Sequence, residues 1–290
     1  MRVNSLLLFI LPALIWGSTW YVIKFQLGVV PPLYSVSYRF FLAGVILLIY
    51  SKATKLNLSF SRKQHLRIAL QGFLLFGVNY WLVYWSEQYL SSGLVAIFFS
   101  TLVFMNIFFG ALILKTKIQL KVIIGALLGF GGTILIFYPE LARMSYNDEV
   151  MQGLLVCTLS VISASLGNIT SAGNQKFGLP VIQTNAFGML YGSLMMFTLA
   201  LLSGTAIVFD TSSTYLISLG YLVIFGSVIA FGAYLTLIGK VGASVAGYVI
   251  VAVPVIALII SYFFEDYQLT YFTVIGIILI ISGNFIVLKK

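Results

Sequence analysis

The stretch that decides the fold is Val29–Tyr50, VVPPLYSVSYRFFLAGVILLIY, an apolar run that contains one charged residue, Arg39. A helix needs about 20 apolar residues to cross a bilayer, and this run meets that length. The stretch therefore predicts a membrane-spanning helix. It also raises the question of why a chain with so few charges keeps an arginine there.

The same pattern extends along the whole chain. Only 8% of the 290 residues are charged and 61% are hydrophobic, whereas a soluble domain carries roughly 25% charged residues. Cutting the sequence at its charges leaves ten apolar stretches, and continuous runs of this kind favour helices over the short alternating segments of a membrane β-barrel. We therefore predict an all-α integral membrane protein with ten transmembrane helices. The stretches lie between Arg2 and Lys24, Lys24 and Lys52, Arg67 and Glu87, Glu87 and Lys115, Lys121 and Glu140, Glu149 and Lys176, Lys176 and Asp210, Asp210 and Lys240, Lys240 and Glu265, and Asp266 and Lys289.

The charges sort by side when the predicted connections are assigned alternately to the two membrane faces. All seven acids fall on one face, where the only basic residues are Lys24, Arg39 and Arg143; the other thirteen lysines and arginines share the face that holds both termini. Cytoplasmic connections carry an excess of Lys and Arg, so we predict that both termini of this multi-pass protein are cytoplasmic. The membrane we expect is the bacterial inner (plasma) membrane. Topology explains the net charge of +9, and we expect a lipid bilayer and no nucleic acid as partner.

Two halves of the sequence are similar to each other. A shift of 149 residues places LLFG (Leu74–Gly77) on VIFG (Val223–Gly226), and a shift of 151 places IGALLGFGG (Ile124–Gly132) on IGIILIISG (Ile275–Gly283). Such a common offset indicates an internal repeat, although two apolar bundles also align tolerably by chance. We predict repeats over 1–144 and 145–290. With five spans each, the second is inverted relative to the first, as in secondary transporters that bind substrate near the midplane.

Several segments resemble the EamA-type branch of the drug/metabolite transporter superfamily. They are IWGSTWYVIK (Ile15–Lys24), YRFFLAG (Tyr38–Gly44), SEQYLSSGLVAIFF (Ser86–Phe99), GASVAGYVIVAVPVIALIISYFFEDYQLT (Gly242–Thr270) and IGIILIISGNFIVL (Ile275–Leu288). The resemblance covers the whole chain. It implies ten helices in a five-plus-five inverted repeat around a central cavity that opens to one side at a time. It also implies transport of small organic metabolites, without selecting one.

The resemblance carries over to individual positions. Arg39 matches the family's arginine in the second helix, Pro254 the proline in the ninth, and Glu265 the acid before the last helix. These matches imply structural or gating roles for Pro254 and Glu265. Glu87 is a further structural candidate, because it is the acid closest in depth to Arg39. The segment FFSTLVFMNIFF (Phe98–Phe109) lacks the proline usual in the fourth helix, which argues against a gate of two symmetric proline kinks.

Arg39 admits three interpretations. Counted from Leu33, it lies roughly 9 Å inside its helix, and an unpaired charge costs at least about 2.5 kcal/mol at the centre of a membrane helix. The guanidinium could pair with Glu87 and anchor two helices, or bind a substrate carboxylate or phosphate together with Lys24. It could also extend to the lipid headgroups.

Aromatic and small polar residues define a candidate substrate site in the first and third predicted helices. An apolar pocket with a few polar anchors suits a small organic ligand, although an aromatic belt at the interface explains the same residues. The candidates, besides Arg39, are Trp16, Ser18, Thr19, Trp20, Asn79, Tyr80 and Trp81. Residues that could supply the opposite wall are Ser163, Asn168, Asn174, Tyr191, Tyr234 and Tyr248.

The scarcity of acids, histidines and cysteines in the predicted spans limits the classes of function and substrate. No acid lies deep in a predicted span, the only histidine, His65, falls in a predicted loop, and Cys157 is the only cysteine. We therefore expect no catalytic residues, metal or cofactor. A cavity without carboxylates favours a neutral, zwitterionic or anionic substrate. The leading hypothesis is a transporter, a monomer or homodimer, that exports amino acids or related metabolites by alternating access. Alternatives are an importer of a small organic acid, a multidrug efflux carrier or a membrane-embedded enzyme.

Overall fold

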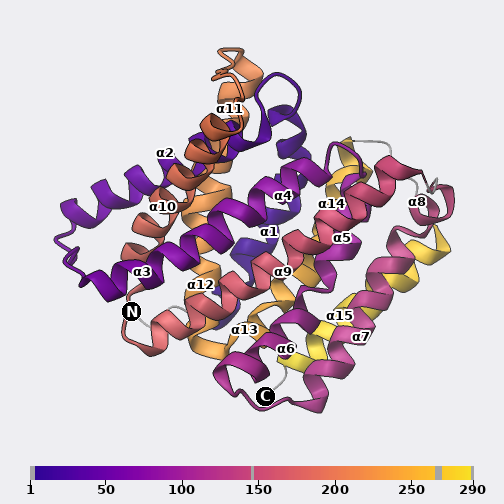
Figure 1. The fold of residues 1–290 in the computed structure, drawn as a ribbon. Coiled ribbons are helices and arrows are strands. Elements are labelled where there is room, and N and C mark those ends of the chain that lie inside the picture. The colour runs from indigo at the N-terminus through magenta and orange to yellow at the C-terminus, as the bar shows by residue number, and fades with distance from the viewer. Residues whose placement is uncertain (1–3, 145–146, 265–269, 289–290) are drawn as a thin grey trace.

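The computed structural model describes residues 4–144, 147–264 and 270–288, and every regular element within these ranges is a helix (Figure 1). This confirms the all-α membrane fold class. In chain order the elements are α1 (Ser5–Ile23), η1 (Lys24–Gln26), α2 (Pro32–Ala53), α3 (Arg62–Gln71), η2 (Gly72–Val78), α4 (Asn79–Ser86), α5 (Ser92–Ser100), α6 (Leu102–Leu114), α7 (Leu120–Ile136), α8 (Tyr138–Arg143), α9 (Asp148–Lys176), α10 (Val181–Leu202), α11 (Ser213–Tyr221), η3 (Leu222–Ile229), α12 (Ala230–Val241), α13 (Ala243–Ala246), α14 (Tyr248–Phe264) and α15 (Tyr271–Leu288).

Helical segments occupy all ten predicted stretches, but they differ in length. Within the described ranges, eight continuous segments are long and apolar enough to cross a membrane. Two apolar helices, Leu120–Ile136 and Ala243–Ile259, are shorter, so the count of ten spans stays a prediction. The eight are Ser5–Gln26, Pro32–Ala53, Arg62–Ser86, Gly93–Leu114, Asp148–Lys176, Val181–Leu202, Ser213–Val241 and Tyr271–Leu288.

Local sequence signals set the helix starts. Ser61 forms a capping box with Gln64 at the start of α3, because each side chain bonds the backbone N–H of the other residue. The Asn147 side chain caps α9, and Asp148 and Glu149 place negative charge in its first turn, where it complements the helix dipole. Pro32 occupies the first turn of α2, where a missing N–H costs nothing. The chain therefore enters each of these helices through ordinary capping chemistry.

The two halves of the chain, residues 4–144 and 147–288, pack in a reciprocal way. Helix α1 packs against α12 and α14, and its counterpart α9 packs against α4 and α6. Likewise α2 contacts η3 while α10 contacts η2, and α2 with α10 and α7 with α15 form the most extensive helix pairs. The segments η2 and η3 are both π-helical, and they contain the repeated LLFG and VIFG motifs. Each sequence repeat therefore has a matching structural position.

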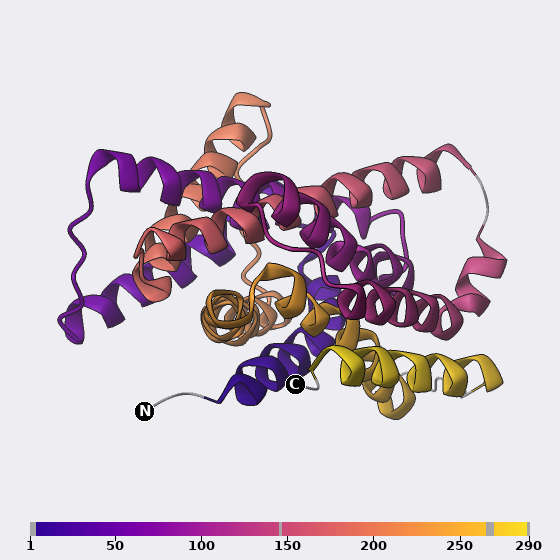
Figure 2. The same cartoon turned by 90° about the horizontal axis from the view of Figure 1, so that it is seen from below.

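Glycines bring α7 and α15 together (Figures 1 and 2). A Cβ atom added to Gly132 would lie 2.6 Å from the carbonyl oxygen of Gly276, and one added to Gly276 would lie 2.5 Å from that of Gly132. Small residues of this kind let membrane helices approach closely. The pair α7–α15 joins the ends of the two halves along a tight seam.

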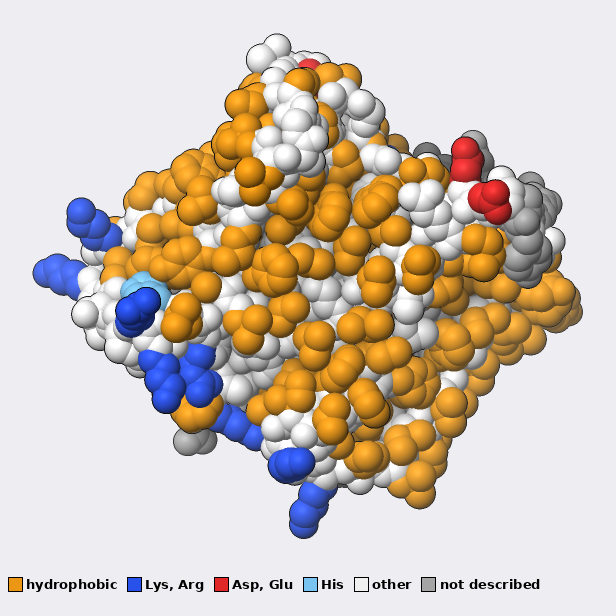
Figure 3. Space-filling view, viewed as in Figure 1, with side chains coloured by type: hydrophobic (Ala, Val, Ile, Leu, Met, Phe, Trp, Pro, Cys, Tyr) orange, Lys and Arg blue, Asp and Glu red, His pale blue; other side chains and the backbone are white. Residues whose placement is uncertain are grey.

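Charged side chains separate on the molecular surface. On the face shown in Figure 3, Lys and Arg gather along one edge, Asp and Glu lie toward the opposite edge, and hydrophobic side chains fill the area between them. Large apolar side chains such as Leu202, Tyr271 and Leu120 are strongly exposed. A surface with this distribution fits a bilayer rather than water.

Candidate functional site

A cavity lies at the centre of the bundle, where α1 and α4 of the first half meet α9 and α12 of the second. Its volume is about 60 Å³, whereas pockets for small organic ligands measure roughly 300–1,000 Å³. Both halves contribute to its wall, so motion of one half against the other changes the cavity. The lining residues are Trp16, Thr19, Trp20, Ile23, Leu75, Asn79, Tyr80, Val83, Phe99, Leu102, Ala164, Asn168, Phe231, Tyr234 and Ile250.

Aromatic rings form much of the wall and contact each other edge to face. The Trp16 ring centroid lies 5.0 Å from those of Phe231 and Tyr234, and Trp20 lies 5.2 Å from Phe99. The Trp16 Nε1–H donates to the carbonyl oxygen of Gly226 at 3.2 Å. These contacts, in the favoured T-shaped geometry, hold α1 of the first half against η3 and α12 of the second.

Two buried asparagines, Asn79 and Asn168, are among the polar residues of the wall. The Asn79 Nδ2 donates to both the backbone oxygen and the Oγ of Ser160 at 3.0 Å, which ties α4 to α9. The Asn168 Nδ2 donates to the Tyr234 hydroxyl at 3.1 Å. The Asn168 Oδ1 is buried and accepts no hydrogen bond. Because unpaired buried acceptors are costly, Asn168 is the polar group best suited to receive a donor from a ligand.

The structure brings together five of the eight predicted substrate residues, namely Trp16, Thr19, Trp20, Asn79 and Tyr80. Ser18 instead forms a hydrogen bond with the Tyr221 hydroxyl. Trp81 stacks on Trp85 with a centroid separation of 5.5 Å and does not line the cavity.

Arg39 lies behind the cavity wall and is fully buried. Its Nε donates to the Oγ of Ser227 at 2.9 Å, and its Nη1 donates to the Tyr84 hydroxyl at 3.5 Å. The guanidinium carbon lies 4.5 Å from the centroid of the Tyr80 ring and 5.2 Å from that of Phe40. Cation–π contacts and one hydrogen bond from the opposite half therefore hold the charge.

These contacts test two of the interpretations of Arg39, namely pairing with Glu87 and extension to the lipid headgroups. Both carboxylate oxygens of Glu87 are buried without a hydrogen-bond partner, so the expected hydrogen-bonded pair of Arg39 and Glu87 is not formed. Complete burial also rules out extension to the headgroups. The Nη2 atom of Arg39 is left without a partner, and a role in binding substrate stays a prediction.

The remaining predicted residues have different outcomes. Pro254 lies inside α14, which packs against α1. Glu265 lies outside the described residues. Of the residues considered for the opposite wall, only Asn168 and Tyr234 line the cavity.

Phe99, Phe231 and Ile250 also line the cavity and were missed by the sequence analysis. The internal repeat held a signal for one of them, since Phe231 follows Tyr80 by 151 residues. The same comparison supports Asn168, which follows Thr19 by 149 residues.

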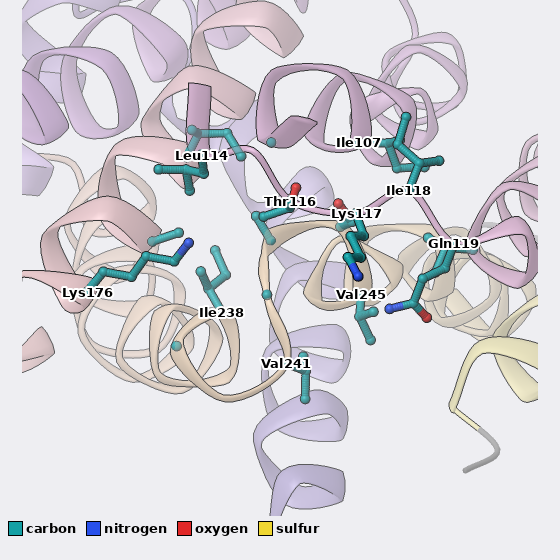
Figure 4. A pocket seen from close by; sticks show the side chains of 18 of the residues that line it. Ile107, Leu114, Thr116, Lys117, Ile118, Gln119, Lys176, Ile238, Val241 and Val245 are labelled. Atoms are coloured by element: carbon teal, nitrogen blue, oxygen red, sulfur yellow. The ribbon is translucent and has the colours of Figure 1, made fainter. Parts of the chain in front are cut away.

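A second, larger pocket of about 470 Å³ lies between the α6–α7 connection and the α12–α13 connection, close to Lys117 and Lys176 (Figure 4). Asn106 lies between this pocket and the central cavity along α6. The Asn106 Nδ2 donates to the carbonyl oxygen of Ala243 at 3.1 Å, and its Oδ1 accepts from the Ser165 Oγ at 2.8 Å. Along α6, Leu102 lines the cavity and Gly110 lines the larger pocket, with Asn106 between them.

A helical bundle with apolar spans and a buried cavity between two similar halves defines a multi-pass membrane protein of the transporter class. Comparison with known sequences agrees, because the EamA-like transporter family matches the chain twice, at residues 3–138 and 151–289. The chain belongs to this family.

Bacterial proteins align with most of the chain, and two of the three named here are described as transporters. The uncharacterized transporter YoaV of Bacillus subtilis is 23% identical over 94% of this chain and 92% of its own length. The uncharacterized inner membrane transporter YedA of Escherichia coli K12 is 29% identical over 86% of this chain and 78% of its own. Protein PagO of Salmonella typhimurium is 24% identical over 99% and 93%, respectively. A crystal structure of a protein with 16% identity superposes with a TM-score of 0.81 over 99% of this chain and 97% of that one, which shows a shared fold.

Proposed function

We propose that the chain is a secondary transporter that moves small organic metabolites, amino acids or related compounds, out of the cell by alternating access. In this proposal ten helices form two inverted five-helix repeats, 1–144 and 145–290, in the bacterial inner membrane with both termini in the cytoplasm. The observation that carries it is the central cavity, whose wall is shared by two halves that pack reciprocally. Rocking of such halves exposes a midplane site to each side in turn.

The small cavity volume supports a mechanism that requires motion. A space of about 60 Å³ is well below the roughly 300–1,000 Å³ of pockets that hold small organic ligands. The bundle must therefore widen on one side to admit substrate. On one side the cavity is bounded by the Arg39 contacts with Ser227 and Tyr84, and on the other by Asn106 and Ser165. In alternating access, the contacts on one side of the cavity break and open it to that side while the contacts on the other side stay intact.

The chemistry of the wall favours a substrate with an apolar or aromatic part and a hydrogen-bond donor. The rings of Trp16, Trp20 and Phe231 offer an apolar surface, and the unpaired Asn168 Oδ1 offers one acceptor. Among the described residues that line the cavity there is no Asp or Glu, so a zwitterion is preferred over a lone cation. The transporter is proposed to work as a monomer, or as a homodimer with one cavity in each subunit.

One observation favours import of a small organic acid as the second candidate. The Arg39 Nη2 atom is buried without a partner behind Tyr80. A rotation of the Tyr80 ring would open a route from the cavity to the guanidinium, which binds carboxylates well. Multidrug efflux and membrane-embedded catalysis have no comparable support.

Transport by purified protein in liposomes tests the proposal. Vesicles loaded with unlabelled L-amino acids are mixed with the same labelled compounds, and we expect uptake by counterflow without chemical conversion. Asn168→Ala should reduce uptake at least tenfold. The matched control is Asn284→Ala, a buried asparagine of α15 outside the cavity, which should retain it. Counterflow of organic acids alone would select the second candidate, and conversion of the solute would contradict transport.

A further inference from the structure

Glu87 is an unusual acid in this structure. It follows the last residue of the Arg62–Ser86 span, and its backbone N–H bonds the carbonyl oxygen of Val83 at 3.0 Å. The residue as a whole is half-buried, but both carboxylate oxygens are buried and accept no hydrogen bond. A buried carboxylate normally has a donor or a cation in contact, because desolvation without compensation is costly. Here the carboxylate is buried and yet has no hydrogen-bond partner.

Charged and titratable groups surround Glu87 without bonding it. Its electrostatic neighbours are Lys24 from η1, Arg39 from α2, Tyr80 and Tyr84 from its own segment, and Cys157 from α9. Burial raises the pKa of the Glu87 carboxyl to about 8, although Lys24 and Arg39 act in the opposite direction. The carboxyl can therefore take up and release a proton near neutral pH.

Glu87 is connected to the cavity through one face of α4. Tyr80, Tyr84 and Glu87 are spaced by four and three residues, which places them along one side of a helix. Tyr80 lines the cavity, and both tyrosines contact the Arg39 guanidinium. Arg39 in turn bonds Ser227 in η3 of the other half. A charge change at Glu87 thus acts on the contact that holds the two halves together on this side of the cavity.

We infer that the Glu87 carboxyl is a proton-binding site that couples transport to a proton gradient, with Arg39 as the positioning residue between it and the cavity. When ionised, the carboxylate attracts Arg39 and competes with Ser227 and Tyr84 for the guanidinium. When a proton from water binds a carboxylate oxygen, the charge disappears and Arg39 is held by Ser227, Tyr84 and the Tyr80 ring. The same proton leaves to water when the carboxyl ionises again, so no other reactant is needed.

The inference rests on the proposed transport function, but its first test does not need a substrate. Infrared difference spectroscopy of the full chain in lipid vesicles detects the C=O stretch of a protonated carboxyl during a pH titration. We expect a band in the wild type that titrates well above the ordinary glutamate range of about 4.3. It should disappear in Glu87→Gln and persist in the control Glu149→Gln, an exposed acid. A wild type without such a band, or the same band in Glu87→Gln, would overturn the site.

The second test asks whether the site couples to transport. In proteoliposomes, an imposed pH gradient should drive accumulation of a labelled amino acid that passes the counterflow test. Glu87→Gln should lose this accumulation, fall to the level of vesicles without a gradient, and show counterflow that no longer depends on pH. Glu87→Asp, which keeps a titratable group, should restore part of the accumulation. Unchanged gradient-driven accumulation in Glu87→Gln would overturn the coupling role.

The two tests separate the failure of this inference from failure of the proposed function. If no amino acid gives counterflow, the proposed substrate class is wrong, and the infrared titration still decides whether Glu87 binds a proton. If counterflow works while no gradient drives accumulation in the wild type, transport stands and proton coupling is wrong. Thermal unfolding of each variant checks that Glu87→Gln is folded.

Discussion

Arg39 shows how a buried charge is held in this chain without a hydrogen bond to an acid. A single strong hydrogen bond to Ser227, a long one to Tyr84 and the faces of two rings surround the guanidinium. The partner Ser227 is 188 positions away in the sequence. The Arg39 side chain therefore links the two halves of the protein through its hydrogen bond to Ser227.

Replacing Arg39 by lysine should destabilise the protein. An ammonium group has no planar fork and stacks less well on Tyr80 and Phe40, so it cannot satisfy Ser227 and Tyr84 together. We expect the free energy of unfolding to fall by about 1–3 kcal/mol, the range for hydrogen bonds to charged groups. Thermal unfolding in detergent measures this. Lys52→Arg, at the exposed end of α2, serves as the control and should unfold like the wild type.

The location of Arg39 was predictable from the sequence, but its partner was not. Glu87 was the natural candidate because it was the acid at a similar depth. Packing of the two halves instead placed η3 beside α2, and tertiary packing of this kind leaves no local signal. Five of the predicted cavity residues were found because α1 and α4 carry dense aromatic and polar clusters. Phe99 and Phe231 were missed because a phenylalanine in an apolar run gives no local sign of what it faces.

Two adjacent glycines of α7, Gly131 and Gly132, allow the close packing of α7 against α15 to be tested. A Cβ atom at Gly132 would meet backbone of α15, whereas one at Gly131 would have nothing within 4 Å. Gly132→Ala should therefore force the helices apart and lower the melting temperature by several degrees, because backbone cannot give way. Gly131→Ala should be neutral or slightly stabilising, since alanine favours a helix by about 1 kcal/mol over glycine. Equal melting temperatures for the two variants would contradict the packing described here.

The helices themselves were the most predictable elements. Apart from Arg39, charges interrupt the sequence near the ends of spans, so α9 begins and ends at charged residues and α2 ends beside Lys52. The π-helical segments η2 and η3 were not predicted, because one extra residue per turn leaves no compositional trace. Their equivalent placement in the two halves, at the repeated LLFG and VIFG motifs, nevertheless supports the offset found in the sequence.

At the scale of the whole molecule, the separation of charge predicts the orientation in the membrane. Ser59 and Thr211 are exposed and lie in connections predicted to face opposite sides. In intact cells, Thr211→Cys should react with a membrane-impermeant maleimide, whereas Ser59→Cys should react only after the membrane is permeabilised. The native Cys157 is buried and serves as the unlabelled control. The reverse pattern would place both termini outside.

The small size of the central cavity has a consequence for how ligands of this protein are found. If the closed arrangement dominates, only the open fraction of molecules can bind, and the apparent dissociation constant rises in inverse proportion to that fraction. Equilibrium binding screens would then report weak affinities even for the true cargo. Variants that remove the hydrogen bonds of Arg39 or of Asn106 would enlarge the open fraction and lower the apparent dissociation constant. Such variants are therefore better suited to ligand screening than the wild type.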